Sequence, residues 1–552
     1  MKSKVVVLTI LLFVVSSIFA VGDFTRMGTI PMPEKDLNNG GTGNIVTGDL
    51  DGDGNVEMFV VNDNTKDGST ETIPRIYKLE YNGTTWDSCW SAVAPIDYQN
   101  TWPALTIDDL DADGKEELIW GPVNSGSNPY RIVVYEEAAA TGSDIFGIAQ
   151  GDTNFAPNSK WEMMPVDSIG KNMRPTKFVV ADIDGDGTKE IVFNDRKGYY
   201  HFGVCSVDDI PDNGDGSETW TMEVSGLDFA LGSIENKWDV AVIGNNAYFP
   251  CELQIAKLSW NAPLWEYTAL SPLRGGASFN GFEVCDVDND GTKEIVTGEY
   301  AWGNYGPYGI DTTRIVLLQE DGDSLKHTPL FVMETSLRLQ GGDHGDIDAD
   351  GNMDFIFGSR YATPNASIYR VEYNGDGSIS DPSNWELTYA DTSYLTFETS
   401  GWGVDGIWGE IAIVNIDSDA ELEVIYGSSS SVSEGLGSQY TPDMAVLDLN
   451  TTAVENLNTP ETFLLLQSYP NPFNPSTTIH YELANSSEVS LTIYDALGRK
   501  VTTLVNKSQS SGTYEVTWNP TNVSSGIYYG QINAKDASGI HHVKAVKMTY
   551  MK

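Results

Sequence analysis

The sequence predicts an all-β protein, made of a seven-bladed β-propeller followed by a small immunoglobulin-like β-sandwich. Three observations predict this fold. An acidic motif of fixed spacing recurs along most of the chain, a short apolar segment follows each copy, and the composition changes near residue 461. The 552 residues are enough for one large repeat array and a smaller domain. Repeats of about sixty residues that each hold several short strands are typical of propellers.

The composition is strongly acidic. Asp and Glu together number 79 and Lys and Arg 32, which gives a formal net charge of −47. A chain with this charge is not expected to bind nucleic acid through a basic face. Because so much negative charge destabilises a compact fold by self-repulsion, the sequence predicts a neutralising partner.

Residues 1–20 predict a secretory signal peptide. Two lysines precede an apolar run from Val5 to Val15, and small residues end the segment at Ala20. The run is short for a transmembrane helix, with an uncleaved anchor as the alternative. No other run is long enough to span a membrane, so we expect a soluble exported protein with no transmembrane segment in the mature chain.

Export would place four cysteines in an oxidising environment. Four cysteines can pair in three ways, and their spacing does not choose among them. Isolated buried thiols are an equally good interpretation. The cysteines are Cys89, Cys205, Cys251 and Cys285.

The acidic motif has the form Asp-x-Asp-x-Asp-Gly-x-x-acid, and "DLDGDGNVE" at residues 49–57 is its first copy. Two like charges ~5 Å apart repel by about 3 kcal/mol at an effective dielectric constant near 20, so four clustered carboxylates need a cation. Hard oxygen ligands in a flexible loop suit Ca²⁺ better than Zn²⁺ or Mg²⁺. The predicted ligands are Asp49, Asp51, Asp53 and Glu57; Asp109, Asp111, Asp113 and Glu117; Asp182, Asp184, Asp186 and Glu190; Asp286, Asp288, Asp290 and Glu294; Asp346, Asp348, Asp350 and Asp354; and Asp417, Asp419 and Glu423.

Five copies of the motif are complete, which makes plain solvated turns a poor alternative, and the sixth copy is weakened. Asn415 and Ala420 stand where the first Asp and the turn glycine are expected. We therefore expect about five Ca²⁺ sites and a doubtful sixth. The loops do not fit EF-hands, because position 12 of the first copy is Val60 and the flanking segments are typical of strands.

The motif spacing predicts seven repeats. The copies begin at residues 49, 109, 182, 286, 346 and 415, and the longest interval contains residues 231–244. That segment fits the framework with Asp239 at position 9 but lacks the other acids, so we expect no metal there. Each loop should join the first two strands of a four-stranded blade. The last repeat lacks a fourth strand, and residues 24–33 are expected to supply it and close the ring.

The acidic repeat, followed by a short apolar strand and Gly, resembles the FG-GAP/VCBS repeat of integrin α-subunit propellers. The resemblance covers residues 23–455, and the propeller is predicted to span residues 21–455. It implies that the acidic loops bind Ca²⁺ on one face of the disc, with the acids given above as ligands.

The connections on the opposite face are expected to be long and aromatic. Rings between Gly, Asn and Asp residues suit stacking on sugar rings or on an extended polymer, although they could also fill the space between blades. The leading hypothesis is therefore a binding or adhesion module for an extracellular glycan or protein ligand. The predicted ligand-binding residues are Tyr98, Trp102, Tyr300, Trp302, Tyr305 and Tyr308, with Tyr394, Phe397, Trp402 and Trp408 as further aromatic residues of this face.

Motifs for catalysis are missing: the chain has no nucleophile elbow, zinc spacing or phosphate loop, so no catalytic residue is predicted. The best enzyme alternative is a polysaccharide lyase that uses His201 with Arg196, Tyr199 and Tyr200. Against it, residues 198–205 have the alternation of an ordinary third strand. His344 is expected to cap the loop that follows it. A structural surface-layer component is the third hypothesis.

From about Glu461 the acidic loops disappear. Alternating segments separated by turn residues predict a small antiparallel β-sandwich at residues 467–552, after a linker at 456–466. "YPNPFNPSTTI", "LTIYDALGRKV" and the terminal "VKMTYMK" resemble a type IX secretion C-terminal sorting domain of type A. The resemblance implies export across the outer membrane by the type IX machinery, followed by surface attachment or release. A plain immunoglobulin-like appendage is the alternative.

Overall fold

The structure is a computed structural model of the 552-residue chain, which divides into two compact units, Met1–Asn450 and Thr451–Lys552. β31 of the second unit begins at Leu464, three residues before the expected start of the C-terminal domain. The structure describes residues 24–30, 41–49, 54–63, 74–96, 103–122, 130–138, 144–151, 154–163, 173–196, 199–231, 238–251, 254–270, 277–301, 313–322, 324–333, 338–360, 368–391, 411–417, 419–427, 444–449, 464–471, 473–483, 486–495, 499–510, 512–520, 523–536 and 541–552.

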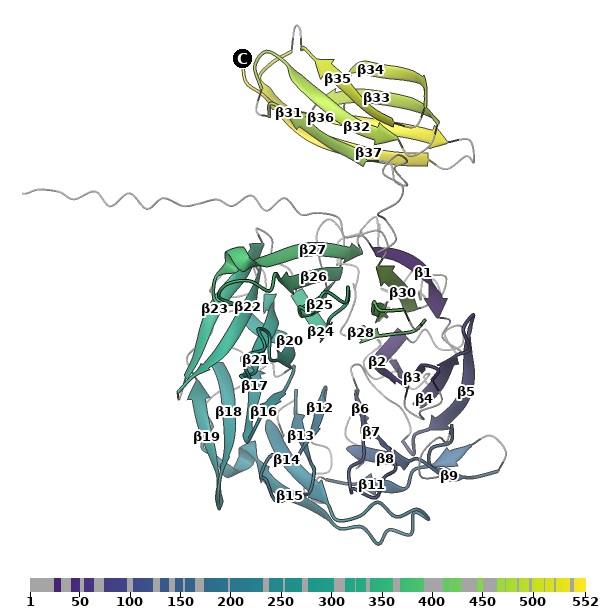
Figure 1. Ribbon diagram of the computed structural model, residues 1–552, viewed down its shortest axis with the longest axis vertical. Coiled ribbons are helices and arrows are strands. Elements are labelled where there is room, and N and C mark those ends of the chain that lie inside the picture. The colour runs from purple at the N-terminus through teal and green to yellow at the C-terminus, as the bar shows by residue number, and fades with distance from the viewer. Residues whose placement is uncertain are drawn as a thin grey trace, which may run out of the picture. The chain divides into compact units, whose positions relative to one another are not determined.

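The first unit is built from small antiparallel sheets of four strands, with almost no helix among its described residues (Figure 1). The sheets comprise β2 (Gly41–Gly48), β3 (Glu57–Asp63), β4 (Arg75–Tyr81) and β5 (Trp86–Val93); β6 (Ala104–Asp108), β7 (Glu117–Gly121), β8 (Ile132–Glu136) and β11 (Ser159–Trp161); β12 (Phe178–Ala181), β13 (Glu190–Asn194), β14 (Phe202–Val207) and β15 (Trp220–Ser225); β16 (Ala241–Ile243), β17 (Asn246–Cys251), β18 (Gln254–Asn261) and β19 (Leu264–Leu270); β20 (Ala277–Cys285), β21 (Glu294–Ala301), β22 (Thr313–Asp321) and β23 (Ser324–Met333); β24 (Arg338–Gly345), β25 (Asp354–Arg360), β26 (Ile368–Tyr373) and β27 (Trp385–Asp391); and β28 (Ile411–Val414), β29 (Glu423–Tyr426), β30 (Met444–Leu449) and β1 (Phe24–Ile30).

Three smaller elements complete the first unit. The hairpin of β9 (Ile148–Ala149) and β10 (Phe155–Ala156) lies between β8 and β11 in the chain, and two short 3₁₀ turns span Gly226–Asp228 and Pro382–Asn384. The sheets of β20–β23 and β24–β27 are joined through a single residue pair, Tyr300 with Arg338.

The first strands of successive sheets lie side by side. β2 contacts β6, β6 contacts β12, β12 contacts β16, and the series continues through β20 and β24 to β28, which contacts β2 again. Figure 1 shows these strands nearest the centre of the unit, with the fourth strands at its rim. The first unit is therefore an all-β, propeller-like domain.

The strand at the start of the described chain completes the last sheet, as the sequence predicts. β1 pairs antiparallel with β30, in a register that runs from Phe24 opposite Leu449 to Ile30 opposite Met444. Because β30 would otherwise present an unpaired edge, this pairing protects the sheet from association with other chains. It also ties the beginning of the propeller-like unit to its end.

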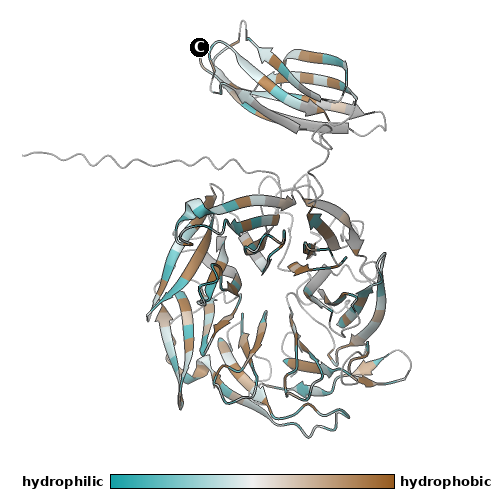
Figure 2. Cartoon of the chain, viewed as in Figure 1, coloured by the Kyte–Doolittle hydropathy of each residue, from teal (hydrophilic) through white to brown (hydrophobic). Residues whose placement is uncertain are grey.

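Apolar side chains alternate along the strands and fill the space between neighbouring sheets. Figure 2 shows hydrophobic and hydrophilic residues alternating along many strands. Phe59 and Trp90 of one sheet share a cluster with Trp120 and Tyr135 of the next. A fully buried side chain of this size contributes about 1.5–3 kcal/mol relative to exposure, so packing between sheets is a main source of stability.

The acidic loops connect the first and second strands of their sheets, again as predicted. The loop that begins at Asp109 joins β6 to β7, and the one that begins at Asp182 joins β12 to β13. Short first and second strands pair directly on either side of each loop, for example Ala181 with Glu190. This pairing brings the first and last residues of the motif close together.

The prediction for the fourth repeat is wrong in register. Residues 241–243 form the first strand, β16, and not the strand that follows the loop. A tight turn at Gly244 and Asn245 joins β16 to β17, with Ile243 opposite Asn246. Gly244 has φ +55°, which this turn requires. Asp239 therefore precedes the first strand and does not occupy position 9 of a loop.

The second unit contains two sheets that share one core. The strand orders are β31-β32-β35 and β34-β33-β36-β37. Ile479 from the first sheet and Leu491 and Ile532 from the second are fully buried in the same cluster. The strands are β31 (Leu464–Tyr469), β32 (Thr477–Leu483), β33 (Ser487–Asp495), β34 (Lys500–Gln509), β35 (Gly512–Trp518), β36 (Gly526–Asp536) and β37 (His541–Tyr550).

The four cysteines are all free thiols, which answers the question that their spacing left open. Cys205 and Cys251 are buried, Cys285 is half-buried and Cys89 is exposed. Burial raises the pKa of the Cys205 thiol well above its usual value, so this thiol is unreactive.

Candidate metal centre

The loop that begins at Asp182 shows how the motif folds. Asp182 Oδ2 accepts a hydrogen bond from Gly187 N at 3.1 Å, and Asp184 Oδ1 accepts one from Asp186 N at 3.0 Å. Glu190, at position 9, accepts from Ile183 N at 2.9 Å. These hydrogen bonds therefore fold the loop backbone around the carboxylates.

The hydrogen bonds accepted by positions 1 and 9 recur in the other complete loops that the structure describes in full. Position 1 accepts from the amide of position 6: Gly114 N to Asp109 at 3.2 Å, Gly291 N to Asp286 at 2.8 Å and Gly351 N to Asp346 at 3.0 Å. Position 9 accepts from the amide of position 2: Leu110 N to Glu117 at 2.5 Å, Val287 N to Glu294 at 3.2 Å and Ile347 N to Asp354 at 2.9 Å.

Two positions adopt left-handed backbone in each of the four complete loops that the structure describes in full. Position 6 is glycine in every complete copy, with φ +96° at Gly187 and +90° at Gly114. Position 4 is also left-handed, at Gly185 (φ +75°), Ala112 (φ +63°) and Ala349 (φ +57°). Such a conformation costs a residue other than glycine roughly 1–2 kcal/mol. The loops therefore keep a locally unfavourable backbone, and this backbone makes their side chains converge.

The acid at position 9 is buried beneath each loop. Burial raises the pKa of Glu117 to about 9, of Glu190 to about 8 and of Glu294 to about 7, and nearby carboxylates act in the same direction. Glu57 of the first loop is also fully buried. A buried carboxylate at neutral pH therefore depends on a nearby positive charge to stay ionised.

The oxygens of the loops fit a hard cation. In each of two loops, three ligand atoms lie within 4.8 Å of one another, from Asp109, Asp111 and Glu117 and from Asp182, Asp184 and Glu190. Several carboxylate oxygens of the loops are buried without a hydrogen-bond partner, namely Asp109 Oδ1, Glu117 Oε1, Asp288 Oδ1 and Glu423 Oε1. Each such oxygen costs free energy unless a cation or water satisfies it. All-oxygen ligation of this kind suits Ca²⁺.

The weakened sixth loop closes through a side-chain amide. Asn415 Nδ2 donates to the carbonyl oxygen of Asp419 at 2.7 Å and to that of Glu421 at 3.3 Å, in place of the carboxylate found in the complete copies. Glu423 still accepts from Ile416 N at 2.5 Å. In the first loop, Asp49 and Glu57 are described, whereas Asp51 and Asp53 lie outside the described residues.

A set of acidic residues on the third strands was not predicted from the sequence. Glu136 pairs directly opposite Glu117, and Glu372 opposite Asp354. Glu136, Asp113 and Glu117 lie close enough to share one ion, and Lys115 Nζ lies 3.0 Å from Asp113 and 3.3 Å from Glu136. Burial raises the pKa of Glu136 to about 8. The signal was the sheet register, because these acids stand on the adjacent strand, directly opposite the last residue of the motif.

Carboxylates also tie neighbouring first strands together. Asp239 Oδ2 accepts from Gly281 N at 2.7 Å and Phe282 N at 3.0 Å of β20, and its other oxygen pairs with Lys177 at 2.9 Å. Asp343 of β24 accepts from Ile413 N of β28 at 2.7 Å. These bonds cross from one sheet to the next and therefore fix the sheets relative to each other.

His344 does not cap the loop that follows it. It lies in β24 opposite Phe355, and its Nδ1 is 3.1 Å from Glu283 Oε2 of β20. The expectation is wrong because alternation along β24 turns this side chain towards the neighbouring sheet.

His201 is not part of a third strand, contrary to the sequence analysis. β14 begins at Phe202, and His201 lies in the connection from β13 with φ +69°. Tyr200 is buried and donates to Met163 O at 2.7 Å.

The predicted ligand-binding aromatics are mostly beyond the described residues. Tyr300 lies in β21, where it pairs with Ser278 and Arg338. Those outside the described residues are Tyr98, Trp102, Trp302, Tyr305, Tyr308, Tyr394, Phe397, Trp402 and Trp408.

Comparison with known families identifies the C-terminal part of the chain. Residues 467–545 match the family model of the secretion system C-terminal sorting domain. The chain therefore carries a type IX sorting domain and is exported to the cell surface or the extracellular space. The match does not extend to the acidic repeats, so their resemblance to FG-GAP/VCBS repeats remains a prediction. Among the described residues, no helix has the length and apolar character needed to cross a membrane.

No curated protein matches the chain closely enough to count as a relative. Among solved structures, the chain is similar to the extracellular domains of a putative one-component system and a putative hybrid two-component system from B. thetaiotaomicron. Identities are 9% and 10%, coverage is 95% and 96% of this chain, and TM-scores are 0.31 and 0.33. The chain spans 60% of the length of each.

A third similar structure is a GH43 β-1,3-galactosidase with galactodeoxynojirimycin. It is 11% identical, the match covers 56% of this chain and 98% of that one, and the TM-score is 0.27. These similarities are too weak to indicate a function.

Proposed function

We propose that the exported chain is a calcium-stabilised, seven-bladed propeller that binds an extracellular polymer. The blade count is supported by the closed series of contacts among seven first strands, from β2 round to β28 and back to β2. The C-terminal sheets would form an immunoglobulin-like sandwich that serves the export machinery. The loops would hold Ca²⁺ on one face, which leaves the connections on the other face for a ligand.

The observation that carries the calcium assignment is the set of buried carboxylate oxygens without a hydrogen-bond partner in the loops, such as Glu117 Oε1 and Asp288 Oδ1. When bound, Ca²⁺ would supply positive charge to the carboxylates that the loop gathers. The protein's own residues orient the oxygens through hydrogen bonds from the loop amides, as at Asp182 and Glu190. Affinity in the range of roughly 10⁻⁴–10⁻³ M, typical of extracellular modules, would suffice outside the cell.

The test of ligand binding is a glycan array probed with the purified mature protein, with and without a chelator. The proposal expects binding to an extracellular polymer without turnover, and loss of that binding in Trp302→Ala and Tyr305→Ala. These two aromatics stand among glycines in the sequence, where stacking on a sugar ring meets little obstruction. Binding that is unchanged in both variants would contradict the assignment of this face.

A polysaccharide lyase is the second candidate, and one observation favours it. His201 has left-handed backbone in a connection between strands, close in sequence to Arg196 and Tyr199. Strained backbone of this kind is frequent at functional sites. A lyase would release unsaturated sugar ends that absorb in the ultraviolet, and His201→Ala would abolish their formation. Absence of such products from all acidic polysaccharides tested would exclude this function.

A further inference from the structure

One acidic loop receives a positive charge from the third strand of its sheet, whereas in the loop at Asp109 the loop's own Lys115 lies 3.0 Å from Asp113. Arg370 of β26 reaches into the loop that begins at Asp346. Its Nε donates to Asp354 Oδ1 at 2.6 Å and its Nη2 to Asp348 Oδ2 at 2.7 Å. The guanidinium is 3.0 Å from Glu372 as well. The side chain of Asp354 is fully buried and that of Arg370 is 12% exposed, so this ion pair lies largely out of solvent.

The position of Arg370 in its sheet is occupied differently elsewhere. Arg370 pairs with Ile356, the second residue after the last acid of its motif. At the same position the other third strands that follow an acidic loop carry one lysine and four apolar residues, which are Lys78, Val134, Val204, Leu317 and Val446. An apolar residue there cannot reach into the loop with a charge.

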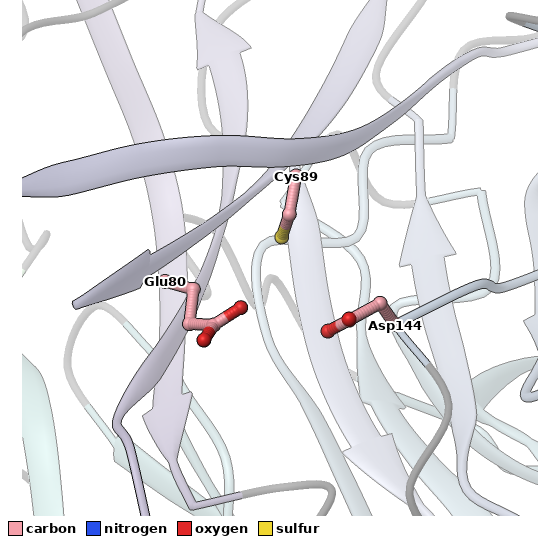
Figure 3. A group of neighbouring side chains, drawn as sticks. All are labelled: Glu80, Cys89 and Asp144. Carbon is pink, nitrogen blue, oxygen red and sulfur yellow. The ribbon is translucent and has the colours of Figure 1, made fainter. Parts of the chain in front are cut away.

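Lys78 stands at the same register position, next to the first acidic loop, and pairs with Asp144. It is buried, and its Nζ is 2.6 Å from Asp144 Oδ1. Figure 3 shows Asp144 facing Glu80 and Cys89, on the neighbouring strands β4 and β5. The short last acid of the motif distinguishes the loop at Asp346 from the loop next to Lys78, which ends in Glu57.

The last acid of this loop is Asp354, whereas the other five motifs end in Glu. Its side chain is one methylene shorter, and both of its oxygens are satisfied: Oδ2 by Ile347 N and Oδ1 by Arg370. In the loop at Asp109 the matching oxygen, Glu117 Oε1, has no hydrogen-bond partner. A metal ion at the Asp346 loop would have to displace the guanidinium, or lie against its positive charge.

We propose that Arg370 takes the place of the metal ion in the loop that begins at Asp346. This inference rests on the proposed calcium function, and it means that one of the five complete loops does not bind Ca²⁺. Two oxygens of this loop, Asp346 Oδ1 and Asp348 Oδ1, keep no hydrogen-bond partner. They are the ligands that the loop would offer to a cation once Arg370 is removed.

A matched pair of variants tests the proposal without replacing Arg370. Asp184 and Asp348 both occupy position 3 of their loops. The number of calcium ions bound by the full mature chain is measured by equilibrium dialysis with Ca²⁺ and elemental analysis. Asp184→Asn should lower the number by one, while Asp348→Asn should leave it unchanged. An equal loss of one ion in both variants would overturn the proposal.

The reciprocal experiment removes the internal cation. Arg370→Met keeps much of the apolar stem and should raise the calcium number by one, and it should make the melting temperature more dependent on calcium than in the wild type. Arg370→Lys keeps a charge and should leave the number unchanged. A calcium number that does not rise in Arg370→Met would contradict the proposal. Wild-type protein without any bound calcium would overturn the proposed function together with this inference, so the two failures are distinguishable.

Discussion

At the scale of single residues, the loops adopt unfavourable backbone conformations that bring their carboxylates together. Position 4 adopts left-handed backbone whether or not it is glycine: Gly185 does so without cost, whereas Ala112 at the same position does so against the preference of an L-residue. The sequence shows which positions carry the acids, but this second requirement is invisible in it, because the motif tolerates several residue types there.

This difference leads to a prediction in two directions. Ala112→Gly should raise the free energy of unfolding of the calcium-bound protein by about 1 kcal/mol, and Gly185→Ala should lower it by a similar amount. No neighbouring atom lies within 4 Å of the position where the new Cβ of Gly185→Ala would stand, so the loss would be conformational. Denaturant unfolding of both variants in calcium buffer measures it. Changes of the same sign in both variants would contradict the explanation.

A single carboxylate can also link neighbouring strands through hydrogen bonds and an ion pair. Asp239 accepts two backbone amides of β20 and pairs with Lys177. Asp239→Ala should cost about 3–5 kcal/mol, because it leaves a cation and two amides without their partner. Asp215→Ala, in an exposed turn, is the control and should leave the unfolding midpoint unchanged. Thermal melting of both variants decides, and an Asp239 variant as stable as the wild type would show that these bonds contribute little.

At the scale of elements, the sequence predicted strands and their connections correctly where its pattern fits one arrangement alone. The motif spacing predicted that each acidic loop joins the first two strands of its sheet, and the need to protect the edge of the last sheet predicted the pairing of β1 with β30. The fourth repeat was misassigned because residues 241–243 fit the pattern of a second strand as well as that of the first strand, which they form. Only the tight turn at Gly244, which replaces a long loop, separates the two alignments.

The β1 strand itself can be tested. Removal of residues 24–30 from the mature chain should expose the edge of β30, lower the melting temperature and cause concentration-dependent association. Ile30 is fully buried in the cluster shared with Met58 and Met444, so the loss includes apolar contacts as well as strand pairing. Melting and size-exclusion chromatography measure both effects. A shortened chain that melts like the wild type and stays monomeric would mean that β1 does not hold the unit together.

The candidate metal centre was only partly predictable. The motif located the acids that turn each loop, as at Asp182 and Glu190. It could not reveal that Glu136 faces Glu117 or that Arg370 enters the loop at Asp346, because both depend on which third-strand residue stands opposite the motif. Side chains that come from a neighbouring strand become visible only when the register is known.

At the scale of the whole molecule, acidity and export fit together. The sorting domain sends the chain to the cell surface or beyond, where calcium is abundant compared with the cytosol. The formal net charge of −47 would strain the fold in the absence of cations. The chain is therefore expected to gain its full stability only after export, when the loops meet calcium.

The most direct test is the melting temperature of the purified mature protein in calcium buffer and in EDTA, at equal ionic strength. Ligand binding to the native state alone stabilises it by about 2.7 kcal/mol for each site when the free ligand is at a hundred times its dissociation constant. Several sites should therefore raise the melting temperature in calcium by many degrees. The same melting temperature in both buffers, with no calcium found in the purified protein, would contradict the account.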